Sequence, residues 1–185
     1  MVKDALNDAG KKMKVSAEHF RKEIGMLRTG RANISLFEEI KVDYYGVPTP
    51  VNQVATLKVP EPTLIVVQPY DPSMLEPVDK AIRGADLGLN PLNDGKLLRV
   101  PIPPLDEERR REMAKRIGRM LEEEKTALRN MRREAKEFIE DLEKEKEITQ
   151  DEKFSGLEQL QKLLDETIER IEEMAKAKEQ EILEG

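Results

Sequence analysis

The sequence predicts an α+β protein of two domains, in which a helical body is interrupted by an inserted unit of strands and turns. All 11 prolines lie between Pro48 and Pro104, and residues 1–47 and 105–185 contain none. Proline lacks a backbone donor and breaks helix interiors, so its distribution separates helix-permitting ends from a strand-and-turn middle. Charged residues make up 38% of the chain and aromatic residues 4%, which favours long exposed helices with narrow apolar faces. We therefore expect one domain from residues 1–30 and 105–185, and a second from residues 31–104.

The N-terminal segment predicts the first helix, which ends at Thr29-Gly30. Gly30 stands where a left-handed cap costs least. The apolar residues recur at steps of mostly three and four, the pattern of an amphipathic helix. This apolar seam consists of Val2, Leu6, Ala9, Met13, Ala17, Phe20, Ile24 and Leu27.

The inserted segment predicts strands and one short helix. Ile40 to Tyr44 alternates between apolar and polar residues, Gly46-Val47-Pro48 supplies a turn, and Asp71 precedes Pro72 as an N-cap does. We expect further strands at residues 51–59, 63–67 and 96–102, and a helix at residues 74–83.

The segment after Pro104 predicts two long helices. Asp106 is a good N-cap for the first, which runs to about residue 146, and a capping box at residues 149–152 opens the second. Each of the three helices is apolar on one stripe only, so we expect a three-helix bundle and, because no heptad seam extends beyond these helices, a monomer. The seams are Met113, Ile117, Met120, Ala127, Met131, Ala135, Phe138 and Leu142 in the first, and Phe154, Leu157, Leu160, Leu164, Ile168, Ile171, Ala175 and Ile182 in the second.

Composition and motifs argue against an enzyme. The chain has no cysteine, no phosphate-binding Gly-x-x-x-x-Gly-Lys pattern and a single histidine, His19, with no acid–base partner nearby in the sequence. We predict no catalytic residue, no metal site and no cofactor. The N-terminus has no apolar signal-peptide core and no long apolar run follows it, so we expect a cytoplasmic protein with no membrane contact.

A basic stripe on the second helix is the strongest functional signal. With Met131 at zero on a helical wheel, five cations fall between about 100° and 200°, away from the seam between about −20° and 40°. Guanidinium groups match phosphate oxygens bidentately, and the scarcity of aromatic residues argues against stacking on unpaired bases. We therefore predict that this face binds the backbone of double-helical RNA. Its cations are Lys125, Arg129, Arg132, Arg133 and Lys136.

A second basic pair, Arg28 and Arg31, flanks Thr29-Gly30. For Arg28, neutralisation of the negative C-terminal end of the helix dipole is as good an explanation as contact with RNA. Arg31 lies beyond the helix end, where the dipole does not account for it.

Six motifs follow one another in a fixed order along nearly the whole chain. They are Arg28 to Ala32, Tyr45 to Ala55, Gly88 to Pro91, Leu98 to Pro103, Glu107 to Arg110 and Arg129 to Ala135. Together they resemble the bacterial ribosome recycling factor family.

The resemblance implies an L-shaped molecule, in which a three-helix bundle joins a β/α/β domain through a flexible hinge. It also implies binding between the ribosomal subunits after termination, and subunit splitting with elongation factor G and GTP. The matching residues for contact with large-subunit ribosomal RNA are Arg28, Arg31, Arg129, Arg132 and Arg133. The matching hinge residues are Gly30, Arg31 and Ala32 on one passage, and Pro101, Pro103, Pro104 and Leu105 on the other.

Two other readings of the pattern stay open at this point. A prefoldin-type chaperone also carries helical arms around a β element, but its hairpin needs far fewer residues than residues 31–104 provide. An enzyme with its site in the insert would need a nucleophile or acid–base constellation, which the sequence does not offer.

Overall fold

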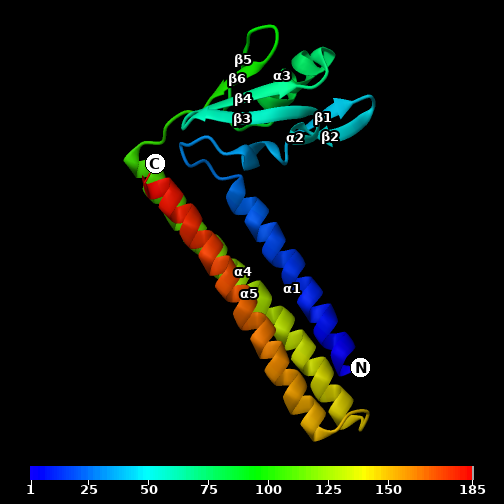
Figure 1. The fold of residues 1–185 in the computed structure, drawn as a ribbon. Helices are drawn as coiled ribbons and strands as arrows, with labels where there is room; N and C mark the ends of the chain where they lie inside the picture. Colours follow the sequence, from blue (N-terminus) through cyan, green and yellow to red (C-terminus); the bar gives the residue numbers. More distant parts are fainter. Residues whose placement is uncertain (185) are drawn as a thin grey trace. The chain divides into compact units, whose positions relative to one another are not determined.

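The structure, a computed structural model, describes residues 1–184 and divides into two compact units (Figure 1). One unit contains Met1–Ile24 and Ala114–Gln180, and the other contains Gly25–Met113 with the residues from Glu181 onward. The first unit is helical, and the second holds every strand among the described residues. This confirms the α+β class, whereas the predicted domain limits at residues 30/31 and 104/105 stay a prediction.

Three long helices form the bundle, as predicted. They are α1 (Val2–Gly25), α4 (Glu107–Lys144) and α5 (Gln150–Glu184). Helix α1 ends before the predicted Thr29-Gly30, since Gly25 weakens its last turn. Leu27 lies beyond the helix but is buried. Because the apolar spacing continues to Leu27, the sequence pattern predicts a longer helix than the structure has. Gly30 does adopt a left-handed conformation, with φ of 77°.

The predicted caps of α4 and α5 are present. Asp106 Oδ1 accepts a hydrogen bond from the Arg109 amide at 2.8 Å. In the capping box of α5, the Thr149 amide donates to Glu152 Oε2 at 2.7 Å and the Glu152 amide donates to Thr149 Oγ1 at 3.2 Å. These side chains satisfy amides that the helix itself leaves unpaired, and so set where each helix begins.

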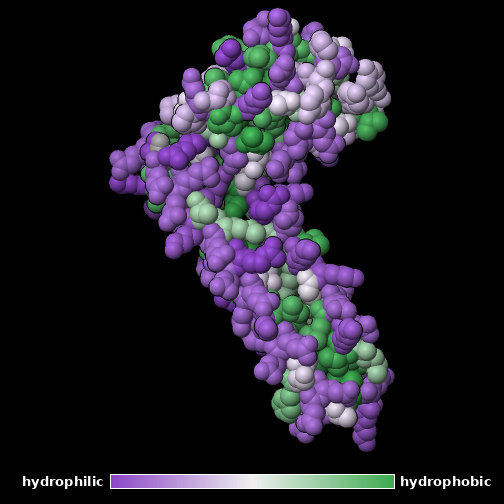
Figure 2. Space-filling model, viewed as in Figure 1, coloured by the Kyte–Doolittle hydropathy of each residue, from purple (hydrophilic) through white to green (hydrophobic). Residues whose placement is uncertain are grey.

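The bundle core is a narrow apolar column, as the composition predicted. Figure 2 shows hydrophobic atoms in a stripe along the helices, flanked by hydrophilic residues. The three helices contribute a few aliphatic or aromatic side chains each, so the bundle is stabilised by long, thin packing. The buried residues include Ala9, Met13, Ala17, Phe20 and Ile24 from α1, Ile117, Leu128, Ile139 and Leu142 from α4, and Leu160, Leu164, Ile171 and Ala175 from α5.

The second unit contains a four-stranded antiparallel sheet and a separate hairpin. The sheet has the order β3-β4-β6-β5, and β1 pairs with β2 in the hairpin. The strands are β1 (Lys41–Tyr44), β2 (Val47–Pro50), β3 (Ala55–Glu61), β4 (Leu64–Pro69), β5 (Leu92–Asn93) and β6 (Leu98–Pro101).

Helix α3 (Leu75–Gly84) packs its apolar face into the core of this unit through Leu75, Val78 and Ile82. As predicted, Asp71 is an N-cap: its Oδ1 accepts from the Ser73 amide at 2.9 Å. The cap opens the short 3-10 helix η2 (Pro72–Met74), which leads into α3.

Two local predictions in the insert are wrong. Residues 51–54 form a helical turn, α2 (Val51–Val54), where a strand was expected; Val51 and Val54 are both buried, and their spacing of three suits a helix. Val47 and Pro48 lie in strand β2, and the turn is made by Tyr45 and Gly46 with φ of 51° and 84°. Proline is tolerated in such an edge strand because it has no donor to leave unpaired. The short helix η1 (Ile34–Phe37) and strand β5 were not predicted.

Candidate nucleic-acid interface

The five cations of the predicted stripe lie on one side of α4, but their surroundings differ. Arg129 and Arg133 are exposed and Arg132 is half-buried. Among residues 1–184, no carboxylate forms an ion pair with any of these three arginines. Their guanidinium groups are therefore available for an external anion, and we call them the arginine trio.

The two lysines of the stripe are already engaged by carboxylates. The Lys125 ammonium lies 2.5 Å from Glu172 of α5 and 3.4 Å from Glu122, and its side chain is only 14% exposed. The hydrogen bond to Glu172 is the main cause that raises the pKa of Lys125. Lys136 lies 3.6 Å from Glu140. The charges of the two lysines, which stand at the two ends of the stripe, are thus neutralised locally. The ion pair between Lys125 and Glu172 also joins α4 to α5.

The apolar seam of α4 is partly where it was predicted. Of the buried residues, Ile117 and Leu142 fall at about 40° and 20° on the same wheel, within the predicted seam, whereas Leu128 and Ile139 fall outside it at about 60° and 80°. Phe138, which was predicted to lie in the seam, is 53% exposed. The core thus extends toward Arg132 at about 100°, which explains its partial burial.

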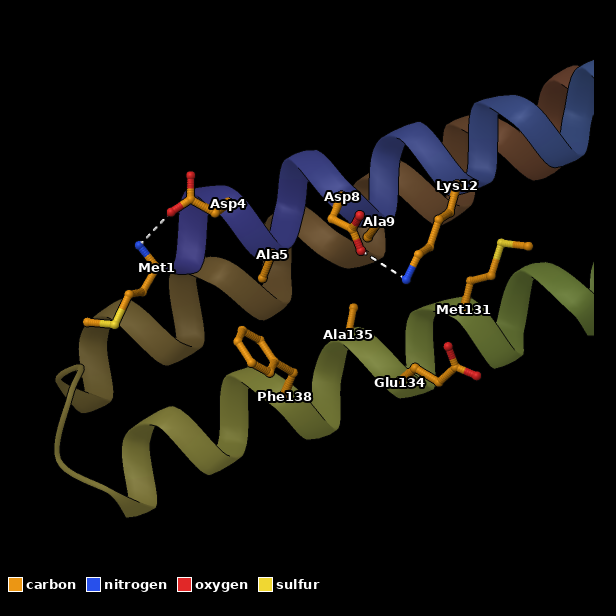
Figure 3. Close-up of a pocket in the computed structure, with 10 residues that line it drawn as sticks. All are labelled: Met1, Asp4, Ala5, Asp8, Ala9, Lys12, Met131, Glu134, Ala135 and Phe138. Atoms are coloured by element: carbon orange, nitrogen blue, oxygen red, sulfur yellow. Dashed lines mark ion pairs between the residues drawn. The ribbon is translucent and has the colours of Figure 1, made fainter.

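Phe138 lines a groove of about 480 Å³ between α1 and α4 (Figure 3). Met131, Ala135 and Phe138 form its α4 wall, opposite Ala5 and Ala9 of α1. Acidic side chains also line the groove, and Asp8 pairs with Lys12 at 2.9 Å. An apolar groove with carboxylates at its margins is unsuited to phosphate, so this side of α4 is not a candidate for RNA contact.

Arg28 has a structural contact that the sequence did not reveal. Its Nη2 donates to the backbone carbonyl of Leu87 in the loop after α3. The next residue, Gly88, has φ of 66°, and a Cβ there would collide with the guanidinium. Arg28 therefore clamps this loop inside the second unit, a role distinct from neutralising the dipole of α1.

The two predicted hinge passages meet within the second unit. A Cβ placed on Gly30 would lie 3.1 Å from the Leu105 amide nitrogen. Thr29 is buried, and its hydroxyl donates to Glu181 Oε1 at 3.3 Å. Arg31 is exposed, and its Nη2 donates to the Glu184 carbonyl at 3.2 Å. Residues before and after the insert are thus joined by direct contacts.

Other kinds of site find no support in residues 1–184. No group of three His, Asp or Glu side chains in that range could hold a metal ion. His19 is exposed on α1, with Nδ1 3.8 Å from Glu23. None of the helices in the same range has the length and apolar character that a membrane span requires.

Three features of this molecule escaped the sequence reading. The Arg28–Leu87 contact joins residues far apart in the chain, and nothing local encodes it. Gly156 of α5 is buried, and a Cβ there would lie 2.7 Å from Val2 of α1. Tyr45 has a left-handed conformation, which the adjacent Gly46 could have suggested, since paired left-handed residues make the tightest hairpin turns.

The chain is similar to curated proteins of one kind over its full length. A family model described as "Ribosome recycling factor" matches residues 20–183. The "Ribosome-recycling factor" of Desulfosudis oleivorans is 51% identical over 173 residues, which cover 94% of each chain. The protein of the same name from Geobacillus kaustophilus is 48% identical over 184 residues, which cover 100% of both.

Two solved structures share the fold. One, described as "Solution structure of the ribosome recycling factor", has a TM-score of 0.84 and 46% identity, and covers 100% of this chain and 98% of that chain. The other describes models for the T. thermophilus ribosome recycling factor and the E. coli elongation factor G bound to the E. coli post-termination complex. It has a TM-score of 0.72 and 42% identity, and covers 99% of both chains.

Proposed function

Because this chain belongs to the ribosome recycling factor family, we propose that it binds the bacterial ribosome after termination and, with elongation factor G and GTP, splits it into subunits. The splitting frees mRNA and tRNA for further rounds of translation. The description of a structural neighbour as bound with elongation factor G to a post-termination complex supports these partners.

The arginine trio on α4 is the observation that carries the proposal. Three guanidinium groups without an ion-pair partner among residues 1–184 stand on one helix of an acidic protein with net charge −6. Such a cluster matches RNA phosphates, and a long helix holds its members at fixed spacing. We assign the trio the role of anchoring the bundle to large-subunit ribosomal RNA, with Lys125 and Lys136 as flanking cations. Arg28 and Arg31 of the second unit are proposed as further RNA contacts.

The two chain passages beside the insert are proposed as the hinge. Gly30 adopts a left-handed backbone conformation without strain. The prolines between Pro101 and Leu105 prevent α4 from continuing toward the N-terminus, so this passage is not helical. Bending at Gly30, Arg31 and Ala32, together with Pro101, Pro103, Pro104 and Leu105, would let force applied to the strand-containing unit reach an anchored bundle.

In this proposal the chemical step is carried out by elongation factor G and not by this chain. GTP hydrolysis is assigned to elongation factor G, which fits a chain without a phosphate-binding loop. We propose that the factor has no catalytic activity or cofactor of its own and works in the cytoplasm as a monomer.

Light scattering of post-termination ribosomes tests the function directly. Adding this chain, elongation factor G and GTP should lower the scattering, and omitting any one of the three should abolish the fall. Arg116→Glu, a charge reversal on α4 at about 300° on the wheel, is the control that should split normally. If the complete mixture leaves the scattering unchanged with a matched elongation factor G, the recycling proposal is wrong.

A further inference from the structure

Three exposed aromatic side chains adjoin the β1–β2 hairpin of the second unit. Tyr45 is 76% exposed and lies in the turn between Tyr44 and Val47, which are also exposed. Tyr70 is 69% exposed and precedes Asp71, whose carboxylate accepts a hydrogen bond from the Tyr45 hydroxyl. These are all the tyrosines of the chain. Figure 2 shows hydrophobic and weakly polar residues at the hairpin. We call Tyr44, Tyr45, Val47 and Tyr70 the tyrosine edge.

Tyr45 occupies a position that disfavours it. Its φ of 51° is left-handed, and Gly46 follows with φ of 84°, as in a two-residue hairpin turn of the I′ kind. Asparagine, aspartate and glycine adopt this conformation readily, whereas a bulky side chain is strained there. An exposed ring gains little from burial, so burial alone does not account for tyrosine at this position.

The edge is held in a defined arrangement despite its exposure. The Tyr45 hydroxyl donates to Asp71 Oδ2 at 3.0 Å, and the Tyr44 and Tyr45 rings pack edge to face with centroids 4.7 Å apart. Asp71 is itself positioned by the Ser73 amide and hydroxyl, which donate to its Oδ1. Rings that are ordered before binding lose less entropy when they are covered by a partner.

The charged residues at the hairpin tip and at the start of η2 are acidic, whereas Lys41 lies at the far end of β1 from the turn. Asp43 and Asp71 are the only charged residues in residues 42–48 and 69–73, which form the hairpin tip and the start of η2. Asp43 accepts a hydrogen bond from the Gly46 amide at 2.7 Å, so it lies at the turn. Carboxylates beside exposed rings repel a phosphate backbone and attract lysine and arginine side chains.

We propose that the tyrosine edge is a protein-docking surface, which receives a partner segment with an apolar centre and flanking lysine or arginine residues. Tyrosine is enriched at the centre of protein interfaces because it adds large contact area with few rotatable bonds. The inference rests on the proposed function for its setting, in which the edge meets a basic protein surface in the ribosomal complex and the arginine trio meets RNA.

Photo-crosslinking tests which molecule covers the edge. Tyr45 is replaced by p-benzoylphenylalanine, and the chain is irradiated with purified post-termination ribosomes, with and without elongation factor G. A crosslink to a lysine- or arginine-rich segment of a protein is expected. A crosslink to ribosomal RNA, to a protein segment without basic residues, or to nothing overturns the proposal.

Substitution gives the second test and separates it from the proposed function. Tyr45→Asn keeps a residue suited to the turn, so the hairpin should fold, and splitting should slow about 10-fold through loss of an anchoring ring. Leu92→Ser, which removes another side chain of this unit that is 61% exposed, should split normally. Failure of the unaltered chain to split ribosomes counts against the function, whereas normal splitting by Tyr45→Asn counts against the docking surface alone.

Discussion

At the scale of single residues, ion pairing divides the cations of the stripe into two kinds. Lys125 and Lys136 have carboxylate partners on α4 or α5, so new phosphate contacts would first have to break existing ion pairs. The arginine trio has no such partner within residues 1–184. We therefore expect substitution of an arginine to affect ribosome binding and substitution of Lys125 to affect the stability of the bundle.

Reversing the charge of Arg132 should weaken ribosome binding by roughly 10- to 100-fold, the range for losing a hydrogen bond between charged groups. Arg132 is chosen because it is half-buried, whereas Arg129 and Arg133 are exposed. Binding of Arg132→Glu to ribosomes, measured by pelleting or fluorescence, checks the effect, and far-ultraviolet circular dichroism should show unchanged helicity.

Salt dependence tells phosphate contact apart from a structural effect of the same substitution. Three phosphate contacts give a slope of log affinity against log salt of about −2 to −3, and Arg132→Glu should make that slope shallower by about 1. Arg116→Glu should leave it unchanged. A slope that is equal in Arg132→Glu and the unaltered chain would remove Arg132 from the anchor.

At the scale of secondary-structure elements, two glycines in long helices have opposite roles. No atom would lie within 4 Å of a Cβ on Gly118 of α4, whereas a Cβ on Gly156 of α5 would lie 2.7 Å from Val2 Cγ1. Gly118→Ala should therefore raise the free energy of unfolding by about 0.5–1 kcal/mol through helix propensity. Gly156→Ala should show no such gain, because it separates α5 from α1.

Urea unfolding of the variants measures both effects. Val2→Ala removes the methyl group that a Cβ at position 156 would meet. The double variant Gly156→Ala with Val2→Ala should therefore lose less free energy of unfolding than the two single variants lose in sum. Simple additivity of the two changes would show that Gly156 is not a contact point between the helices.

The capping box of α5 predicts a pH dependence. Hydrogen bonds from the Thr149 amide and hydroxyl hold the pKa of Glu152 below its ordinary value. The carboxylate therefore stabilises the folded state above the unfolded-state pKa of about 4.3, and this contribution is lost as the pH falls through the lower pKa of the folded state. Glu152→Gln should be less stable than the unaltered chain at pH 7, and the difference should shrink toward pH 3. A difference between the two urea midpoints that stays constant over this range would contradict the assignment.

At the scale of the whole molecule, the proposed hinge predicts that a substitution can slow the splitting of ribosomes without weakening the binding of this chain to them. Gly30→Ala forces a side chain into a left-handed position that faces the Leu105 amide, while Gly95→Ala meets the same backbone strain in open space. Each should lower the free energy of unfolding by about 1–2 kcal/mol through the strain alone. Gly30→Ala should also slow splitting while ribosome binding changes little. Equal splitting rates in the two variants would argue against the hinge at Gly30.

The sequence by itself determined the elements whose signals are local. The absence of proline from the ends marked the helices, and the caps at Asp106, Asp71 and Thr149 are satisfied within three residues, so they could be read directly. The order of six motifs was sufficient to indicate the family. The arginine trio was visible as a stripe, because helical periodicity alone places its members on one side.

Only the tertiary structure decided the features that depend on distant neighbours. The neutralisation of Lys125 requires Glu172 on another helix. The wheel placed Ile117 and Leu142 correctly in the α4 seam, but it missed the burial of Leu128 and the exposure of Phe138, which depend on how the helices pack. The helical turn at Val51–Val54 depends on the burial of both valines, whereas valine by its own propensity favours a strand. The reason is the same in each case: local propensity differs little between the alternatives, and long-range packing supplies the free energy that selects one of them.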